Sequence, residues 1–142
     1  MPHHDTAALS QLSASGQTIA NADHDIRGRK VKDKAGNEIG TVDDLLIDDE
    51  ERKVRFLRVE HGGFLGLGET KSFIPVDAIT RITADEVFID HSREHVAGAP
   101  RYDPDLVKDL KYYGSLYDHY GYSPFWGLGY TYPGIPITRG AV

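Results

Sequence analysis

Two histidines and a glutamate have the spacing of a zinc-peptidase motif. The run His91-Ser92-Arg93-Glu94-His95 matches H-x-x-E-H, in which histidines one helical turn apart hold zinc and the glutamate activates water. Such chemistry also needs a third ligand and a large enclosed cleft. Because the motif lies between a predicted terminal hairpin and a linker, we expect a solvated turn here. A metal-dependent hydrolase centred on His91 and His95 is kept only as an alternative.

Charged residues cluster in two neighbouring segments. The acidic run consists of Asp43, Asp44, Asp48, Asp49, Glu50 and Glu51. It lacks the alternating ligands and sixth-position glycine of an EF-hand loop, so we expect a solvated hairpin and no calcium site. The basic strand that precedes it carries Arg27, Arg29, Lys30, Lys32 and Lys34. Cross-strand pairing or an acidic partner surface could neutralise both segments.

The familiar motifs of nucleophilic and nucleotide chemistry are missing from the sequence. It contains no Gly-x-Ser-x-Gly elbow, no Gly-Lys-Ser/Thr phosphate loop and no Gly-x-Gly-x-x-Gly turn before a helix. It also contains no cysteine, which excludes disulfides, thiolate metal sites and cysteine nucleophiles. We therefore predict no catalytic residue, no metal site and no cofactor, and expect that the protein is not an enzyme.

Aromatic side chains concentrate at the C-terminus. All eight tyrosines lie beyond residue 101. Aromatic faces can stack on nucleobases, but basic and acidic residues are balanced in this segment, so no electrostatic groove accompanies the rings. We expect the rings to pack on the barrel or on a second subunit, because large apolar patches mark interfaces. The candidate packing or self-association residues are Tyr113, Tyr117, Tyr120, Phe125 and Trp126.

Residues 25–96 have the pattern of short β-strands separated by turns. Alternating runs at 26–32, 54–60, 71–74, 79–83 and 86–90 flank a nearly continuous apolar run at 38–48, which predicts a central strand covered on both sides. Asp33 and Gly36 indicate a hairpin turn, and the residues after Pro75 suit one helical turn. About six short strands without long intervening helices predict a small antiparallel barrel or a tightly coiled sheet.

Two further segments complete the predicted domain. The loop Gly62-Gly63-Phe64-Leu65-Gly66-Leu67-Gly68 frames three large apolar side chains with glycines, and we expect it to be a shaped loop that plugs one barrel end. After the linker 97–100, Asp103 and Pro104 predict the start of a helix. Its apolar face comprises Leu106, Val107, Leu110, Tyr113, Tyr117 and Tyr120.

Composition narrows the classes of partner. The chain has 142 residues and a formal net charge of −6, which fits one domain with tails and has the wrong sign for general nucleic-acid binding. No apolar run approaches the roughly 20 residues that cross a bilayer, and the first residues lack a signal-peptide pattern. We expect a cytoplasmic protein without membrane insertion, in which residues 1–24 form a flexible arm.

These residues together resemble the PRC-barrel domain family. The likeness rests on Gly28-Arg29-Lys30-Val31, on the run from Gly36 to Asp48, on residues 54–59, on the glycine loop and on Ile74-Pro75-Val76-Asp77-Ala78-Ile79. The resemblance implies a binding or assembly module, since the family includes the cytoplasmic part of the photosynthetic reaction-centre H subunit and the C-terminal domain of a ribosome maturation factor. The sequence resembles the free-standing bacterial members more than it resembles either of these two.

The resulting prediction is a mainly β protein with three parts. These are an N-terminal arm at 1–24, a small antiparallel PRC-type β-barrel at 25–96, and a linker, helix and Tyr-rich extension at 97–142. The predicted function is a non-catalytic, self-associating adaptor that binds a protein partner and forms a dimer or larger homo-oligomer. The alternative is an RNA- or ribosome-associated module that binds through the basic strand, by Arg27, Arg29, Lys30 and Lys32.

Overall fold

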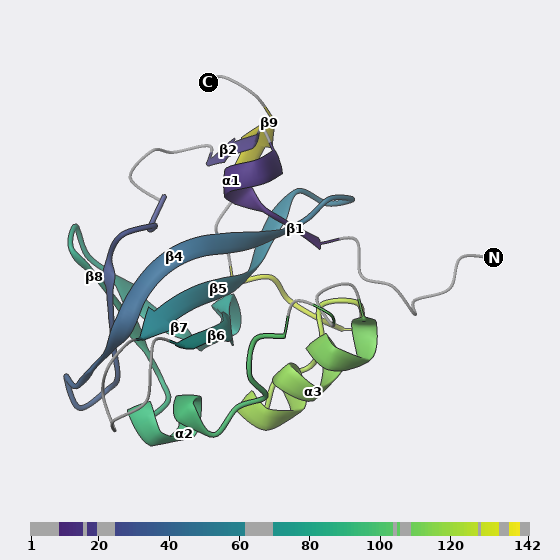
Figure 1. The fold of residues 1–142 in the computed structure, drawn as a ribbon. Helices are drawn as coiled ribbons and strands as arrows, with labels where there is room; N and C mark the ends of the chain where they lie inside the picture. The colour runs from purple at the N-terminus through teal and green to yellow at the C-terminus, as the bar shows by residue number, and fades with distance from the viewer. Residues whose placement is uncertain are drawn as a thin grey trace.

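A computed structural model shows a curled sheet with helices α2 and α3 at one end and the short helix α1 at the other (Figure 1). The structure describes residues 9–15, 17–19, 25–61, 70–103, 105, 109–127, 129–133 and 137–139. The elements are β1 (Leu9–Gln11), α1 (Leu12–Ser15), β2 (Gln17–Ile19), β3 (Lys30–Lys32), β4 (Glu38–Asp48), β5 (Lys53–His61), β6 (Thr70–Pro75), the 3-10 turn η3 (Val76–Ala78), β7 (Ile79–Ile82), β8 (Glu86–Ile89), α2 (Arg93–Ala97), α3 (Leu110–Tyr120) and β9 (Ile137–Arg139). The predicted mainly β class with a C-terminal helix is confirmed.

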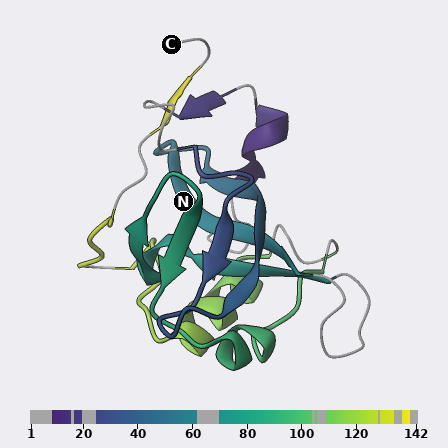
Figure 2. The ribbon, with the colours of Figure 1, turned by 90° about the vertical axis from the view of Figure 1, so that its left-hand side faces the viewer.

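Seven strands form the main sheet, in the order β6-β5-β4-β3-β8-β7, with β1 also paired to β4. The sheet is mixed, because β3 pairs with β8 in parallel while the other described pairs are antiparallel. Among the described strands the ladder is open between β6 and β7, yet η3 joins these two edges directly in the chain. Both views place the β2–β9 pair at the opposite end from α2 and α3 (Figure 2).

The turn between β3 and β4 explains the first predicted hairpin. The Asp33 carboxylate accepts hydrogen bonds from the backbone N–H groups of Ala35, at 3.0 Å, and Asn37, at 2.8 Å. Gly36 has φ +88°, a conformation that costs little only for glycine. Burial opposes ionisation of Asp33, but these hydrogen bonds outweigh it and hold the carboxyl pKa below its usual value. The sequence prediction of this turn is confirmed.

The long hairpin of β4 and β5 carries the core. Five consecutive β4 residues, 44–48, and four consecutive β5 residues, 54–57, are buried, as expected for strands covered on both faces. The strands approach closely at Gly40, where an added Cβ would lie 2.5 Å from the carbonyl oxygen of Glu60. Glycine at this position therefore lets the hairpin close.

Residues 9–15, which belong to the flexible arm predicted for residues 1–24, pack against the sheet. β1 pairs antiparallel with the end of β4, with Leu9 opposite Asp48. Leu9 and Leu12 are buried in the hydrophobic core, and the Ser13 hydroxyl donates to Asp44 at 2.6 Å. Leu9, Leu12 and Ile19 looked too few apolar side chains to repay ordering. Backbone pairing of β1 along the edge of β4 at residues 46–48 adds hydrogen bonds that this count does not include.

The C-terminal helix starts later than predicted. α3 begins at Leu110, and its N-cap is Asp109, whose carboxylate accepts from the Lys111 N–H at 2.9 Å. Asp103, the predicted cap, instead accepts from the Asp105 N–H at 2.9 Å in a local turn. Both aspartates satisfy the composition rule for a cap, so the sequence alone did not distinguish them. Pro104, Leu106 and Val107 lie outside the described residues.

Candidate functional site

The C-terminal helix α3 covers one face of the barrel with aromatic rings. Tyr113 and Tyr117 contact Phe56 of β5, with ring centroids 5.2 and 5.0 Å apart. Tyr113 also lies 6.1 Å from Phe73 of β6. Tyr113, Tyr117 and Tyr120 are at most 3% exposed, so the structure places these three predicted packing residues against their own chain and not at a free surface.

Burial sets the chemistry of these tyrosines. Removal from water raises the pKa of Tyr112, Tyr113, Tyr117 and Tyr120 far above its usual value, because a phenolate would be poorly solvated there. The Tyr112 hydroxyl donates to the Arg101 carbonyl oxygen at 2.7 Å. The phenols therefore stay neutral at physiological pH and serve as packing groups, not as bases.

Arg55 of β5 joins the barrel to the segment that follows α3. Its side chain is 1% exposed and its Nη2 lies 3.0 Å from the Asp48 carboxylate; a second ion pair joins it to Glu51. Burial disfavours the charged guanidinium, but the hydrogen bond and charge of Asp48 outweigh this and raise the Arg55 pKa. The Phe125 ring lies 4.3 Å from the guanidinium carbon, within the range of a cation–π contact.

Five aromatic side chains beyond α3 are only partly buried. We call them the aromatic segment: Tyr122, Phe125, Trp126, Tyr130 and Tyr132. Tyr130 and Tyr132 lie 5.7 and 5.3 Å from the Arg55 guanidinium, and Trp126 packs edge-on against Tyr117 at 5.8 Å. The segment is thus fixed on the barrel while part of each ring stays accessible. Phe125 and Trp126 were predicted from the sequence; Arg55, one of several charges interleaved with apolar residues in β5, was missed.

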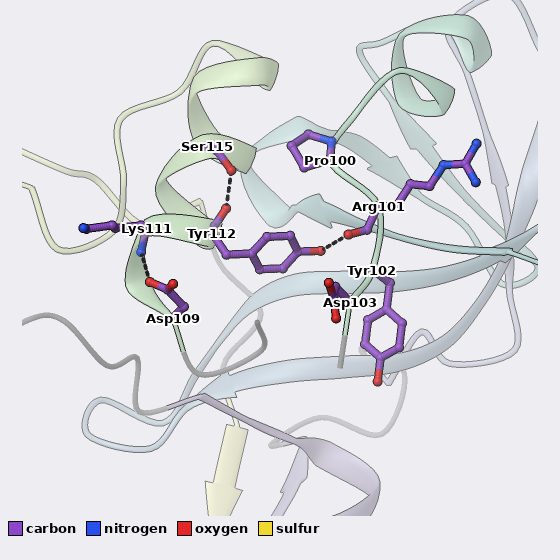
Figure 3. Close-up of a pocket in the computed structure, with 8 residues that line it drawn as sticks. All are labelled: Pro100, Arg101, Tyr102, Asp103, Asp109, Lys111, Tyr112 and Ser115. Carbon is purple, nitrogen blue, oxygen red and sulfur yellow. Dashed lines mark hydrogen bonds between the residues drawn. The ribbon is translucent and has the colours of Figure 1, made fainter. Parts of the chain in front are cut away.

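A shallow hollow of about 560 Å³ lies between the linker and α3 (Figure 3). Its lining combines two basic and two acidic side chains with rings and small residues: Pro100, Arg101, Tyr102, Asp103, Asp109, Lys111, Tyr112 and Ser115. The Ser115 hydroxyl donates to the Tyr112 carbonyl oxygen at 2.7 Å, so it is held by its own helix. The lining offers polar contacts, and none of its eight residues is a histidine that could activate Ser115. The sequence reasoning did not anticipate this hollow.

The two motif histidines meet a third from α3. His91 stacks on His95 with centroids 5.0 Å apart, and His95 stacks on His119 at 4.1 Å. Ser92 caps α2 by accepting from the His95 N–H at 3.0 Å, so the expected solvated turn is in fact a capped helix. Within the part of the chain that the structure describes, no three His, Cys, Asp or Glu side chains are placed to hold a metal ion.

The basic strand is neutralised by nearby acids. Arg27 pairs with Asp25 at 2.6 Å, and Lys32 pairs with Glu86 at 2.7 Å. Lys30 lies 3.4 Å from Glu38, and Arg29 donates to the Thr83 carbonyl oxygen at 2.8 Å. These contacts leave little free positive charge for phosphates, which weakens the alternative of RNA binding through this strand.

The acidic run pairs with arginines and a lysine on neighbouring strands. Asp43 accepts from Arg58 at 2.9 Å and from Lys71 at 2.8 Å, and Asp48 pairs with Arg55. The predicted cross-strand neutralisation therefore occurs, but its partners lie on β5 and β6 and not on the basic strand. The predicted plug loop with Gly63, Phe64, Leu65, Gly66 and Leu67 lies outside the described residues.

Comparison with known families agrees with this architecture. The model of the PRC-barrel domain matches residues 19–96, more than half of the chain. The chain belongs to the PRC-barrel family. This assignment confirms the resemblance of the sequence, and it indicates a protein-interaction module in general terms. The search of curated proteins found no match. Among the described residues, no helix combines the length and the apolar character needed to span a membrane.

Proposed function

We propose that this PRC-barrel chain is a non-catalytic assembly module that self-associates through the aromatic segment. The observation that supports it best is the set of five partly exposed rings, three of which, Phe125, Tyr130 and Tyr132, contact the buried Arg55. Aromatic side chains are enriched at the centres of protein interfaces and supply most binding hot spots. Rings already fixed in place lose little conformational freedom on binding, which favours affinity.

Charge supports a second copy of the chain as the partner. The cation beneath the rings, Arg55, is already paired with Asp48 and Glu51, so this surface carries no uncompensated charge from it. A symmetric dimer places the same patch against itself. The patch is mainly aromatic, with Lys53 over the Tyr132 ring at 5.0 Å, so like-charge repulsion there is small. An interface formed instead by the acidic hairpin around Asp49 and Glu50 would place like charges opposite each other, in a chain that already carries a net charge of −6.

Support for a non-catalytic role comes from the titratable groups. The tyrosines beneath the segment are neutral and buried, so their hydroxyls offer no accessible proton acceptor. A general base needs a free, accessible nitrogen or oxygen near its substrate. These side chains fit a packing role better than a reacting one.

The test is the mass of the full chain across a range of concentrations, measured by sedimentation equilibrium. We expect the mass to rise above that of a monomer for the native chain and to stay monomeric for Trp126→Gln. Thr131→Gln is the matched control, since Thr131 is exposed in the same stretch and should associate as the native chain does. A native chain that stays monomeric throughout would refute self-association.

The same variants distinguish self-association from binding of a different protein partner. The native chain, Trp126→Gln and Thr131→Gln serve as baits in cell extract. A partner captured by the native chain and by the Thr131 variant, but lost from the Trp126 variant, would keep the aromatic segment as the docking surface. A partner retained by all three would place the docking surface elsewhere.

A further inference from the structure

Three histidine rings form a stack that joins two separate helices. His91 precedes α2, His95 lies within it, and His119 belongs to the last turn of α3. The planes of His91 and His95 are 13° apart, and those of His95 and His119 are 16° apart at a centroid distance of 4.1 Å. The rings therefore lie nearly parallel, face to face, where α2 meets α3.

Reciprocal hydrogen bonds hold the inner pair together. His95 Nε2 donates to the His119 carbonyl oxygen at 2.9 Å, and His119 Nε2 donates to the His95 carbonyl oxygen at 2.7 Å. A carbonyl oxygen only accepts, so both rings carry their proton on Nε2. A further proton on either ring must go to its Nδ1. Protonation of both rings would place two cations in contact. His91 Nε2 lies 2.9 Å from the Tyr122 hydroxyl oxygen, which ties the stack to the aromatic segment.

We propose that His91, His95 and His119 form a proton-sensitive clamp that holds α3 on the barrel at neutral pH and releases it in mildly acidic solution. Release would uncover Phe56 and Phe73, the barrel rings that Tyr113 now covers. The clamp would thus decide whether an apolar face of the barrel is available to a partner. The proposed clamp does not require self-association of the aromatic segment.

The direction follows from where protons bind. In the released state His91 would titrate near the usual histidine pKa of about 6.5. In the clamped state, burial is the main cause that lowers the pKa of His91, followed by the charge of the neighbouring His95. Asp90 raises this pKa, while His119 and Lys34 lower it further. The released state therefore binds more protons, so clamping is complete above about pH 6.5 and weakens as the pH falls below it.

The other charged and titratable groups around the stack come from each element that meets there. From the β3–β4 turn come Asp33 and Lys34, from the end of β8 Asp90, from α2 Arg93 and Glu94, and from α3 and the residues after it Asp118, Tyr120 and Tyr122. Asp33 accepts from the Arg93 N–H at 3.2 Å, and Lys34 lies 4.0 Å from Asp90. The Asp33 carboxylate is thus occupied, whereas the exposed Asp90 carboxylate offsets part of the positive charge on His91.

Backbone hydrogen exchange measured by NMR between pH 7.5 and 5 tests the clamp on the full chain. We expect the exchange-competent fraction of α3 to rise by up to about 10-fold per pH unit below about pH 6.5, for one extra proton bound on release. The amides of β4 and β5 should keep their protection. Emission of Trp126, the single tryptophan, should move to longer wavelength over the same range.

The decisive variant is His95→Gln combined with His119→Gln. A glutamine amide can still donate to the opposite carbonyl but cannot take up a proton. The pH dependence of α3 should therefore weaken, because His91 loses the two neighbours that help to lower its pKa. His61→Gln is the control, because His61 lies on β5 and contacts Ser72 at 2.9 Å, away from the stack; it should behave as the native chain does.

Two results would overturn the clamp. The first is an unchanged pH dependence of α3 in the double variant. The second is simultaneous loss of protection in β4 and β5, which would mean acid unfolding of the whole domain. If the double variant fails to fold, NMR titration of the native histidine rings still decides. Full protonation of both His95 and His119 near pH 6.5 while α3 stays protected would exclude a clamp.

Discussion

Replacement of Arg55 by methionine should be among the most destabilising changes in the barrel. Met keeps most of the apolar stem but removes the guanidinium, which is 1% exposed and bonded at 3.0 Å to Asp48, itself 7% exposed in its side chain. Removing one member of a buried ion pair leaves the other uncompensated and costs about 3 to 5 kcal/mol. Glu51 is 60% exposed, so losing that second pair adds little.

The assay is urea unfolding at neutral pH, followed by circular dichroism. Domains of this size are stable by about 5 to 15 kcal/mol, so the predicted loss would move the midpoint substantially. Arg81→Met is the matched control: Arg81 lies exposed over the Phe88 ring at 4.3 Å, and its replacement should change stability by less than about 0.5 kcal/mol.

A double-mutant cycle separates the ion pair from simple packing loss. Asp48→Asn in the Arg55→Met background should cost less than Asp48→Asn alone, with a coupling of at least about 1.5 kcal/mol, because the uncompensated carboxylate is gone. A loss below about 1 kcal/mol for Arg55→Met, or additive single changes, would refute the assignment of Arg55 as a buried link between the barrel and the aromatic segment.

Three other substitutions test the core by the same urea titration. Gly40→Ala should cost about 1 to 3 kcal/mol, because its Cβ would lie 2.5 Å from the Glu60 carbonyl oxygen; an unchanged midpoint would contradict the close approach of the strands. Phe56→Ala should cost about 3 to 5 kcal/mol, and a loss below 1 kcal/mol would mean that α3 does not pack there. The Tyr117 hydroxyl is buried without a hydrogen-bond partner among the described residues, so Tyr117→Phe should leave stability unchanged or raise it by up to about 1 kcal/mol; a clear loss would reveal a partner.

The strands could be predicted because their signals are local. The Asp33–Gly36 turn, the apolar run of β4 and the helical turn after Pro75 each follow from a few adjacent residues. The face of α3 was also readable, since Tyr113, Tyr117 and Tyr120 recur at helical spacing and are buried. Family membership adds to these signals but does not extend to the C-terminal helix, because the match ends at residue 96.

What could not be predicted depends on contacts between distant residues. The pairing of Leu9–Gln11 with β4 and the parallel pairing of β3 with β8 leave no local trace. Arg55 resembled one charge of an alternating strand until the aromatic segment covered it. His119 lay outside the H-x-x-E-H motif, and only the docking of α3 brings it onto His95.

A shortened chain that ends at Ala99 tests most directly whether α3 covers the barrel. Without α3, Phe56 and Phe73 lose the tyrosines that bury them. We expect the shortened chain to bind an apolar-surface dye at neutral pH and to be less stable to urea by at least about 3 kcal/mol. An equal urea midpoint together with no dye binding would contradict the packing of the aromatic helix on the barrel.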